Sequence, residues 1–212
     1  MLVSVLSFLL TYVLPISFSH PVFLLSFLPL SLMILFVAFM FSKSDLRTSL
    51  NALSFSFLGL FYCGILICFI YLIFHFNADN GRYFIFLLLL GTFLGDTGAY
   101  AFGRLFGKRK LYPKLSPGKT WAGAFGGFAM TFFSVIAIKF LFMPSISLLD
   151  TFLLSFLLSI SCQIGDLAES FVKRGFNVKD SGNIIPGHGG MLDRIDALMF
   201  GAPVVFLFSF LR

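Results

Sequence analysis

The chain has 212 residues, of which 58% are hydrophobic and 11% are charged, and its formal net charge is +6. Soluble domains average about 25% charged residues, so this composition excludes an ordinary soluble domain and predicts an integral membrane protein. The three cysteines lie in apolar stretches and lack metal-ligand spacing, which argues against a disulfide framework or a zinc site.

Apolar stretches recur along the whole chain, and each is long enough to cross a hydrocarbon layer of about 30 Å. We expect seven transmembrane helices, at about 2–18, 21–41, 53–76, 83–102, 123–143, 148–165 and 195–211. The first stretch lacks a basic start and a cleavage site, so we interpret it as a membrane helix and not a signal peptide. The predicted fold class is an all-α polytopic bundle in a single membrane domain, 1–212. The pattern does not determine the arrangement of the N-terminal helices, 1–80.

Basic residues gather in three of the predicted loops. Loops 43–50, 103–121 and 166–194 hold 12 of the 15 Lys and Arg residues. With seven spans, these three loops lie on one side of the membrane. The positive-inside rule then places them, together with the N-terminus, in the cytoplasm.

Acidic residues collect at the level of these basic loops. Asp166 ends one predicted span, Asp193 and Asp196 begin the last, and Asp96 lies inside the fourth. A carboxylate within a membrane span is a functional candidate by default. Carboxylates that can hold Mg²⁺, beside cations that can hold phosphate, suggest phosphoryl or nucleotidyl transfer. The alternative is that these acids cap helices or pair with nearby cations. For Glu169, pairing with Lys173 four residues later is equally well supported.

The predicted loop before residue 121 offers phosphate-binding groups. Lys119 and the hydroxyls of Ser116 and Thr120 can bind phosphate oxygens, and Gly118 allows close backbone approach. Either hydroxyl can instead cap the helix that follows.

Two glycine-rich segments have different interpretations. Gly91, Gly95 and Ala99 recur every four residues, which predicts a small-residue face for close helix packing. His188 lies in a turn between glycines, where it could act as a general base or a phosphate ligand, although a structural role is more common for such a residue.

These motifs together resemble the phosphatidate cytidylyltransferases, also called CDP-diacylglycerol synthases. The signature of that family is matched without a gap by Ser170, Lys173, Arg174, Lys179, Asp180, Pro186, His188, Gly189, Gly190, Asp193, Arg194 and Asp196. The segments 165–170, 96–100 and 116–121 fit as well, so the resemblance covers the catalytic signature region, 91–200.

The resemblance implies a polytopic helical enzyme with a divalent metal site. It would make CDP-diacylglycerol from CTP and phosphatidate and release pyrophosphate. The expected partners are these two substrates and the lipid bilayer, without nucleic acid, and a homodimer is compatible with the pattern. The expected location is the bacterial inner membrane, with the active-site loops in the cytoplasm.

On this basis we assign a role to each candidate residue. The residues expected to hold Mg²⁺ are Asp166, Asp193, Asp196 and Glu169. The catalytic set comprises Asp166, Asp193, Asp196, Lys173 and Arg174. The expected substrate-binding residues are Ser116, Lys119, Thr120, Lys179, His188, Arg194 and Asp96. Asp96 is expected to orient a cation or a second metal ion. Two rival functions remain open: CTP-dependent transfer to another lipid, such as an ether lipid or a polyprenol, and an ion-coupled transporter.

Overall fold

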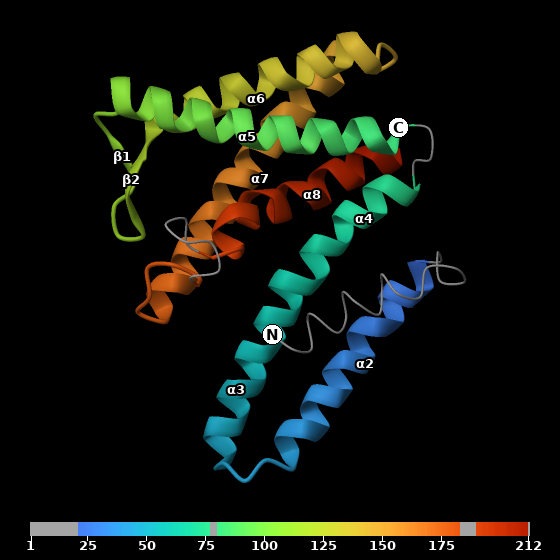
Figure 1. Cartoon of the computed structure of the whole chain (residues 1–212), viewed down its shortest axis with the longest axis vertical. Helices are drawn as coiled ribbons and strands as arrows, with labels where there is room; N and C mark the ends of the chain where they lie inside the picture. The colour runs from blue at the N-terminus through green and yellow to red at the C-terminus, as the bar shows by residue number, and fades with distance from the viewer. Residues whose placement is uncertain (1–20, 77–79, 183–189, 212) are drawn as a thin grey trace. The chain divides into compact units, whose positions relative to one another are not determined.

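The structure is a computed structural model that describes residues 21–76, 80–182 and 190–211, with side chains from residue 29 onward. Its helices are α2 (Pro21–Met40), α3 (Leu46–Gly59), α4 (Leu66–Phe76), α5 (Gly81–Phe106), α6 (Trp121–Phe142), α7 (Leu148–Gly175) and α8 (Leu192–Leu211) (Figure 1). A π-helical segment, η1 (Leu60–Ile65), joins α3 to α4. Two short strands, β1 (Lys110–Tyr112) and β2 (Ser116–Thr120), form an antiparallel hairpin.

The described helices fit a membrane protein. Five helical stretches in the described part of the chain are long and apolar enough to cross a bilayer: 46–75, α5, α6, α7 and α8. The predicted span at 21–41 corresponds to α2. The predicted span at 2–18 lies outside the described residues, so the total of seven spans stays a prediction.

The chain divides into two compact units, Met1–Cys68 and Phe69–Arg212. In the first unit, α2 and α3 lie side by side, and Asp45 caps the start of α3 by accepting a 3.1 Å hydrogen bond from the Thr48 amide. Hydrogen bonds from Thr48 hold the pKa of the Asp45 carboxyl below its ordinary value. The second unit contains the remaining long helices and the hairpin.

Glycines let α5 and α6 pack closely. A Cβ atom added at Gly95 would lie 2.6 Å from Thr131 Oγ1, and one at Gly123 would lie 2.7 Å from the Ala99 carbonyl oxygen. The Thr131 hydroxyl crosses the interface and donates to the Gly91 carbonyl at 3.0 Å. The small-residue packing face predicted from the sequence is therefore confirmed.

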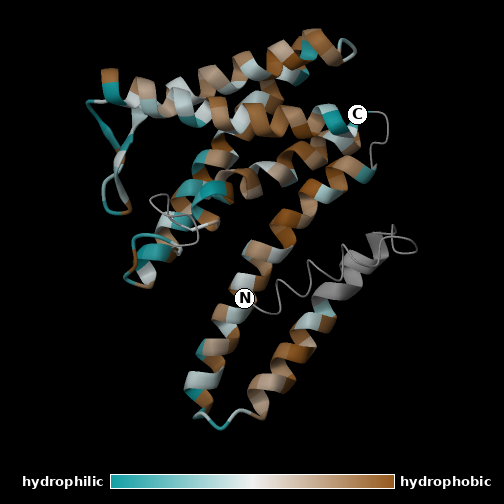
Figure 2. Cartoon of the chain, viewed as in Figure 1, coloured by the Kyte–Doolittle hydropathy of each residue, from teal (hydrophilic) through white to brown (hydrophobic). Residues whose placement is uncertain are grey.

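An apolar core holds this unit together. The side chains of Leu87 and Leu88 on α5, Leu154 and Leu158 on α7, and Val205 on α8 are buried in it. Hydrophilic residues gather on the hairpin and on the last turns of α7 (Figure 2). The polar chemistry of the unit therefore lies near one end of its helices.

Two features differ from the sequence-based expectation. Helix α7 continues to Gly175, ten residues beyond the predicted end at 165, because charged side chains continue the helix after the apolar stretch ends. The loop between α5 and α6 contains the β hairpin, which an all-α fold omits. Both differences place charged residues on regular elements that hold them in defined positions.

We predict that Gly98→Ala will weaken the contact between α5 and α6. The added Cβ would lie 2.7 Å from the backbone carbonyl oxygen of Gly126, so the helices would have to separate. Overpacking of this kind costs about 1–3 kcal/mol, and the change should lower the unfolding temperature in detergent. Gly59→Ala is the matched control, because a Cβ there meets nothing within 4 Å. Equal unfolding temperatures for the two variants would contradict the packing argument.

Candidate active site

The candidate site forms where α7 and α8 approach each other most closely. A Cβ atom added at Gly165 on α7 would lie 2.8 Å from the carbonyl oxygen of Asp196 on α8 and 2.9 Å from Phe200 Cβ. Only a glycine fits this contact without displacing a backbone. The contact brings Asp166, the next residue on α7, beside the first turns of α8.

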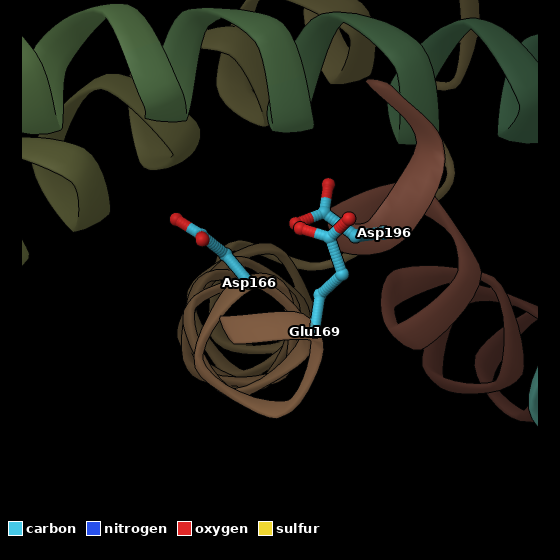
Figure 3. Close-up of side chains that lie close together, drawn as sticks. All are labelled: Asp166, Glu169 and Asp196. Carbon is cyan, nitrogen blue, oxygen red and sulfur yellow. The ribbon is translucent and has the colours of Figure 1, made fainter. Parts of the chain in front are cut away.

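Three carboxylates converge at this contact. Oxygen atoms of Asp166, Glu169 and Asp196 all lie within 4.8 Å of one another (Figure 3). The spacing of three residues puts Asp166 and Glu169 on one face of α7, and α8 supplies Asp196. Glu169 and Asp196 are buried, with 2% and 8% of their surfaces exposed, whereas Asp166 is partly exposed. We call these three residues the carboxylate cluster.

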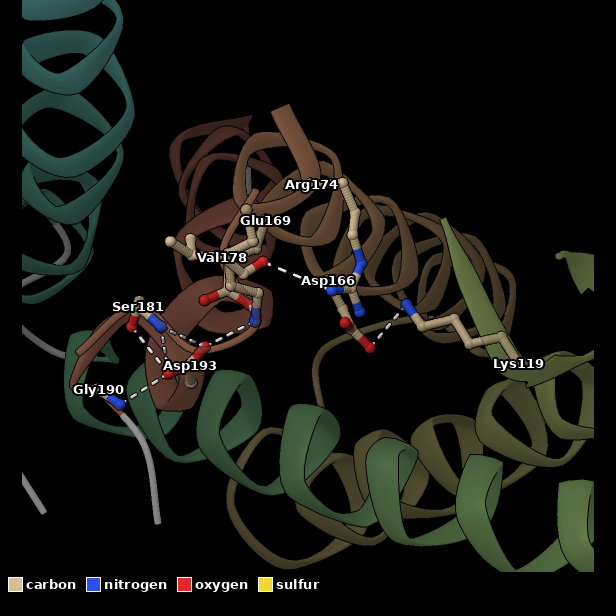
Figure 4. A network of polar contacts seen from close by, with 9 residues as sticks. Lys119, Asp166, Glu169, Arg174, Val178, Ser181, Gly190 and Asp193 are labelled. Atoms are coloured by element: carbon tan, nitrogen blue, oxygen red, sulfur yellow. Dashed lines mark hydrogen bonds and ion pairs between the residues drawn. The ribbon is translucent and has the colours of Figure 1, made fainter. Parts of the chain in front are cut away.

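Two lysines neutralise part of this negative charge (Figure 4). The Lys119 ammonium, on β2, lies 2.6 Å from Asp166 Oδ2. The Lys173 ammonium, on α7, lies 2.7 Å from Glu169 Oε2 and 2.6 Å from Asp193 Oδ1. Each lysine therefore contacts one member of the cluster, and Lys173 also links α7 to α8.

Asp193 is the most heavily hydrogen-bonded acid of the site. Besides Lys173, it accepts hydrogen bonds from the Ser181 amide at 3.0 Å, the Ser181 hydroxyl at 2.8 Å and the Gly190 amide at 2.7 Å. Its carboxylate thus joins the segment after α7 to the segment before α8. The sequence assigned Asp193 to the metal ligands, whereas the geometry groups Asp166, Glu169 and Asp196.

One oxygen of the cluster has an unused hydrogen-bonding capacity. Glu169 Oε1 is buried and has no hydrogen-bond partner among the described residues. A buried acceptor without a donor is costly, and a cation shared with the neighbouring carboxylates would satisfy it. Mg²⁺ prefers oxygen ligands of this kind, so the residues present fit such an ion.

The loop before α6 supplies both a cap and a charge. The Thr120 hydroxyl accepts a 3.1 Å hydrogen bond from the Gly123 amide at the start of α6. The capping alternative is therefore confirmed for Thr120, and its phosphate-binding role stays a prediction. Ser116 begins β2, where it is partly buried. The Lys119–Asp166 ion pair joins this loop to the signature region on α7.

The remaining predicted residues surround the cluster or lie beyond it. Arg174 is exposed and points its guanidinium toward the Val178 carbonyl, at 3.5 Å. Lys179 and Arg194 are also exposed. Asp96, on α5, is exposed and near enough to Asp166, Asp196 and Lys119 to interact with their charges. His188 lies outside the described residues.

The sequence predicted that these acids lie at one depth in the membrane, but it did not predict two of their contacts. The first is the direct pairing of Lys119 with Asp166, for which the only signal was that both were expected on one side of the membrane. The second is the binding of Asp193 by Ser181 and Gly190. No spacing rule connects Ser181 with a carboxylate 12 residues later, so this contact had no usable signal.

Comparisons with known proteins give a consistent result. A model described as the cytidylyltransferase family matches residues 1–211. A phosphatidate cytidylyltransferase from Staphylococcus haemolyticus is 40% identical over 161 residues. Its counterparts from Staphylococcus epidermidis and Staphylococcus aureus are 39% and 37% identical over the same length. Each match covers 74% of this chain and 62% of the relative, so the chain matches less than two thirds of these curated proteins.

We predict that Lys173→Met will destabilise the folded protein, because two carboxylates lose the cation that they share. The change leaves Glu169 and Asp193 close together without their shared cation. Breaking a fully buried pair by removing one partner costs about 3–5 kcal/mol, and this part-buried pair should cost somewhat less, which should still appear as a fall in unfolding temperature in detergent.

The double variant Lys173→Met/Glu169→Gln provides the internal test, because it also removes one of the stranded charges. It should be less destabilised than the sum of the two single variants. Lys179→Met, which changes an exposed lysine, is the control. Additive losses in the double variant would show that Lys173 and Glu169 are not energetically coupled.

Proposed function

The chain belongs to the cytidylyltransferase family, and from this premise we propose that it transfers the cytidylyl group of CTP to phosphatidate. The products are CDP-diacylglycerol and pyrophosphate. The observation that carries the proposal is the carboxylate cluster, which two apolar, membrane-length helices supply and two lysines flank. Relatives named phosphatidate cytidylyltransferase support the choice of lipid substrate.

We assign Mg²⁺ to Asp166, Glu169 and Asp196. The unpartnered Glu169 oxygen and the short spacing of the three carboxylates support this choice. When bound, the ion supplies positive charge for the phosphates of CTP. Asp193 contributes by holding Ser181, Gly190 and Lys173 in place. A direct metal contact by Asp193 and a second metal ion near Asp96 stay predictions.

The reaction needs no strong base, because the phosphate of phosphatidate is already an anionic nucleophile. One of its oxygens attacks the α-phosphorus of CTP, and the bond from that phosphorus to the bridging oxygen breaks to release pyrophosphate. The barrier comes from bringing anions together and from charge that develops on the leaving group. We propose that Lys119, Lys173 and Arg174 lower it, and that Lys179 and Arg194 bind further phosphate oxygens.

The membrane setting follows from the solubility of the two substrates. The acyl chains of phosphatidate stay in the leaflet, and its headgroup reaches the polar site. We propose that this end of the bundle faces the cytoplasm of a bacterial cell, where CTP is available. The basic loops support this orientation through the positive-inside rule. The homodimer stays a prediction.

We predict that Asp196→Asn will lower turnover at least about a hundredfold, because removal of one charge-stabilising group typically costs that much. Purified protein is given labelled CTP and phosphatidate, and the lipid-soluble product is measured with Mg²⁺ or with a chelator. The wild-type protein should lose product formation in the chelator.

Asp45→Asn is the control for this experiment, because asparagine caps a helix as well as aspartate does. Its turnover should match the wild type. Normal turnover in folded Asp196→Asn would remove Asp196 from the site. Product formed from a polyprenol or an ether lipid, but not from phosphatidate, would support the rival lipid substrate.

A second prediction concerns Lys119 and the affinity for CTP. If its ammonium binds a CTP phosphate, Lys119→Ala removes a charge-assisted contact worth about 1.5–3 kcal/mol. Apparent CTP affinity should then fall roughly ten- to a hundredfold. Lys119→Arg should restore little of the CTP affinity, because a planar guanidinium group replaces a compact ammonium group. Lys43→Ala, in a different basic loop, is the control. Unchanged CTP titration of Lys119→Ala would exclude this contact.

A further inference from the structure

The end of α5 and its connection to α6 carry a concentration of positive charge. Residues 97–149 contain no Asp or Glu. Five cations in this stretch are exposed and form no ion pair with a described residue: Arg104, Lys108, Arg109, Lys110 and Lys114. Arg104 donates a 3.2 Å hydrogen bond to the Tyr100 hydroxyl on the same helix. We call these five residues the hairpin basic surface.

Large apolar side chains are also exposed in this part of the chain. Leu105 and Phe106, at the end of α5, are 73% and 62% exposed. Tyr112 on β1 and Trp121 at the start of α6 are 45% and 44% exposed. Cations mixed with aromatic rings at the end of membrane helices are typical of the layer where hydrocarbon meets lipid headgroups.

The position of the hairpin agrees with this layer. It joins the end of one candidate membrane span to the start of the next, so topology puts it at the membrane surface. Its base is well held, because the Trp121 amide donates to the Arg109 carbonyl at 3.1 Å and Thr120 caps α6. A cation on this base is therefore held in a defined position relative to the start of α6.

The same hairpin reaches the carboxylate cluster. Lys119, on β2, pairs with Asp166 (Figure 4). Lys110 and Lys114 are exposed on the other parts of the hairpin. A single short element thus connects an exposed cationic surface with a charged group of the site.

We propose that the hairpin basic surface binds the anionic headgroups of phospholipids in the surrounding leaflet. It holds a local pool of anionic lipid beside Lys119, and this delivery role rests on the proposed function. Charge complementarity favours anionic over zwitterionic headgroups, and the exposed apolar side chains favour a lipid surface over a soluble anion. Each Lys or Arg near such a surface contributes about 1 kcal/mol, a factor of about five in local enrichment.

Trp121 offers a direct test, because it is the only tryptophan of the chain and lies at the base of the hairpin. The full chain is placed in phosphatidylcholine nanodiscs that contain a spin-labelled lipid. Quenching of Trp121 by spin-labelled phosphatidylglycerol is compared with quenching by spin-labelled phosphatidylcholine at equal mole fraction. The anionic lipid should quench more strongly, and high salt should remove the difference.

Two charge variants are compared in the same experiment. Lys110→Gln/Lys114→Gln should lower the preference for the anionic lipid at least about fivefold. Lys43→Gln/Arg47→Gln removes the same number of exposed charges from another basic loop and should keep the preference. Equal quenching by the two lipids in the wild type would overturn the proposal, as would an equal loss of preference in the two variants. Loss of the preference on adding inorganic phosphate at constant ionic strength would assign the surface to soluble anions instead.

An activity measurement separates this proposal from the proposed function. The Lys110→Gln/Lys114→Gln variant should show a raised apparent KM for phosphatidate, with unchanged KM for CTP and unchanged unfolding temperature. A raised KM for CTP alone would contradict lipid recruitment. If the wild type makes no CDP-diacylglycerol at all, the proposed function fails, whereas the quenching experiment still decides whether the surface binds lipid.

Discussion

The site depends on how closely two membrane helices approach each other at one glycine. Between helices in a bilayer there is no hydrophobic driving force, so close backbone approach and polar contacts determine the packing. At Gly165 the carbonyl of Asp196 occupies the space that any side chain would need. This contact sets the register between α7 and α8, and the register brings acids from both helices together. The glycines between α5 and α6 do the same for the pair that carries the hairpin and Lys119.

Charge balance is the second constraint on this region. Three of the four carboxylates in this region, those of Asp166, Glu169 and Asp193, contact the ammonium groups of Lys119 and Lys173. Burying carboxylates is costly unless they are paired, so both lysines stabilise the folded site. The two lysines leave part of this negative charge without a paired cation among the described residues. This imbalance supports the proposed Mg²⁺ and gives a reason for three acids to be close together.

Local sequence patterns predicted the long helices and one packing face. The features that the sequence did not predict depend mainly on contacts between distant segments. Hydropathy located the long helices, and the four-residue spacing of Gly91, Gly95 and Ala99 identified a real packing face. Hydropathy placed the end of α7 at 165, because it does not register the pairing of Glu169 with Lys173 that continues the helix. The hairpin and the Lys119–Asp166 pair depend on contacts between distant segments, which a single sequence does not specify. Thr120 shows a third limit, since one hydroxyl suited two roles and only the geometry showed that it caps α6.

The pairing of Lys119 with Asp166 has a consequence for the state of the site before a ligand binds. The ammonium is tethered to β2, so its effective concentration at Asp166 is set by the polypeptide and not by the ions in solution. A tethered counter-ion cannot diffuse away, and a partly buried pair is screened by salt less than an exposed one. A nucleotide that recruits Lys119 must exchange one anionic partner for another. The Lys119 side chain is only 21% exposed in this pair, so its ammonium group is already largely removed from water before such an exchange.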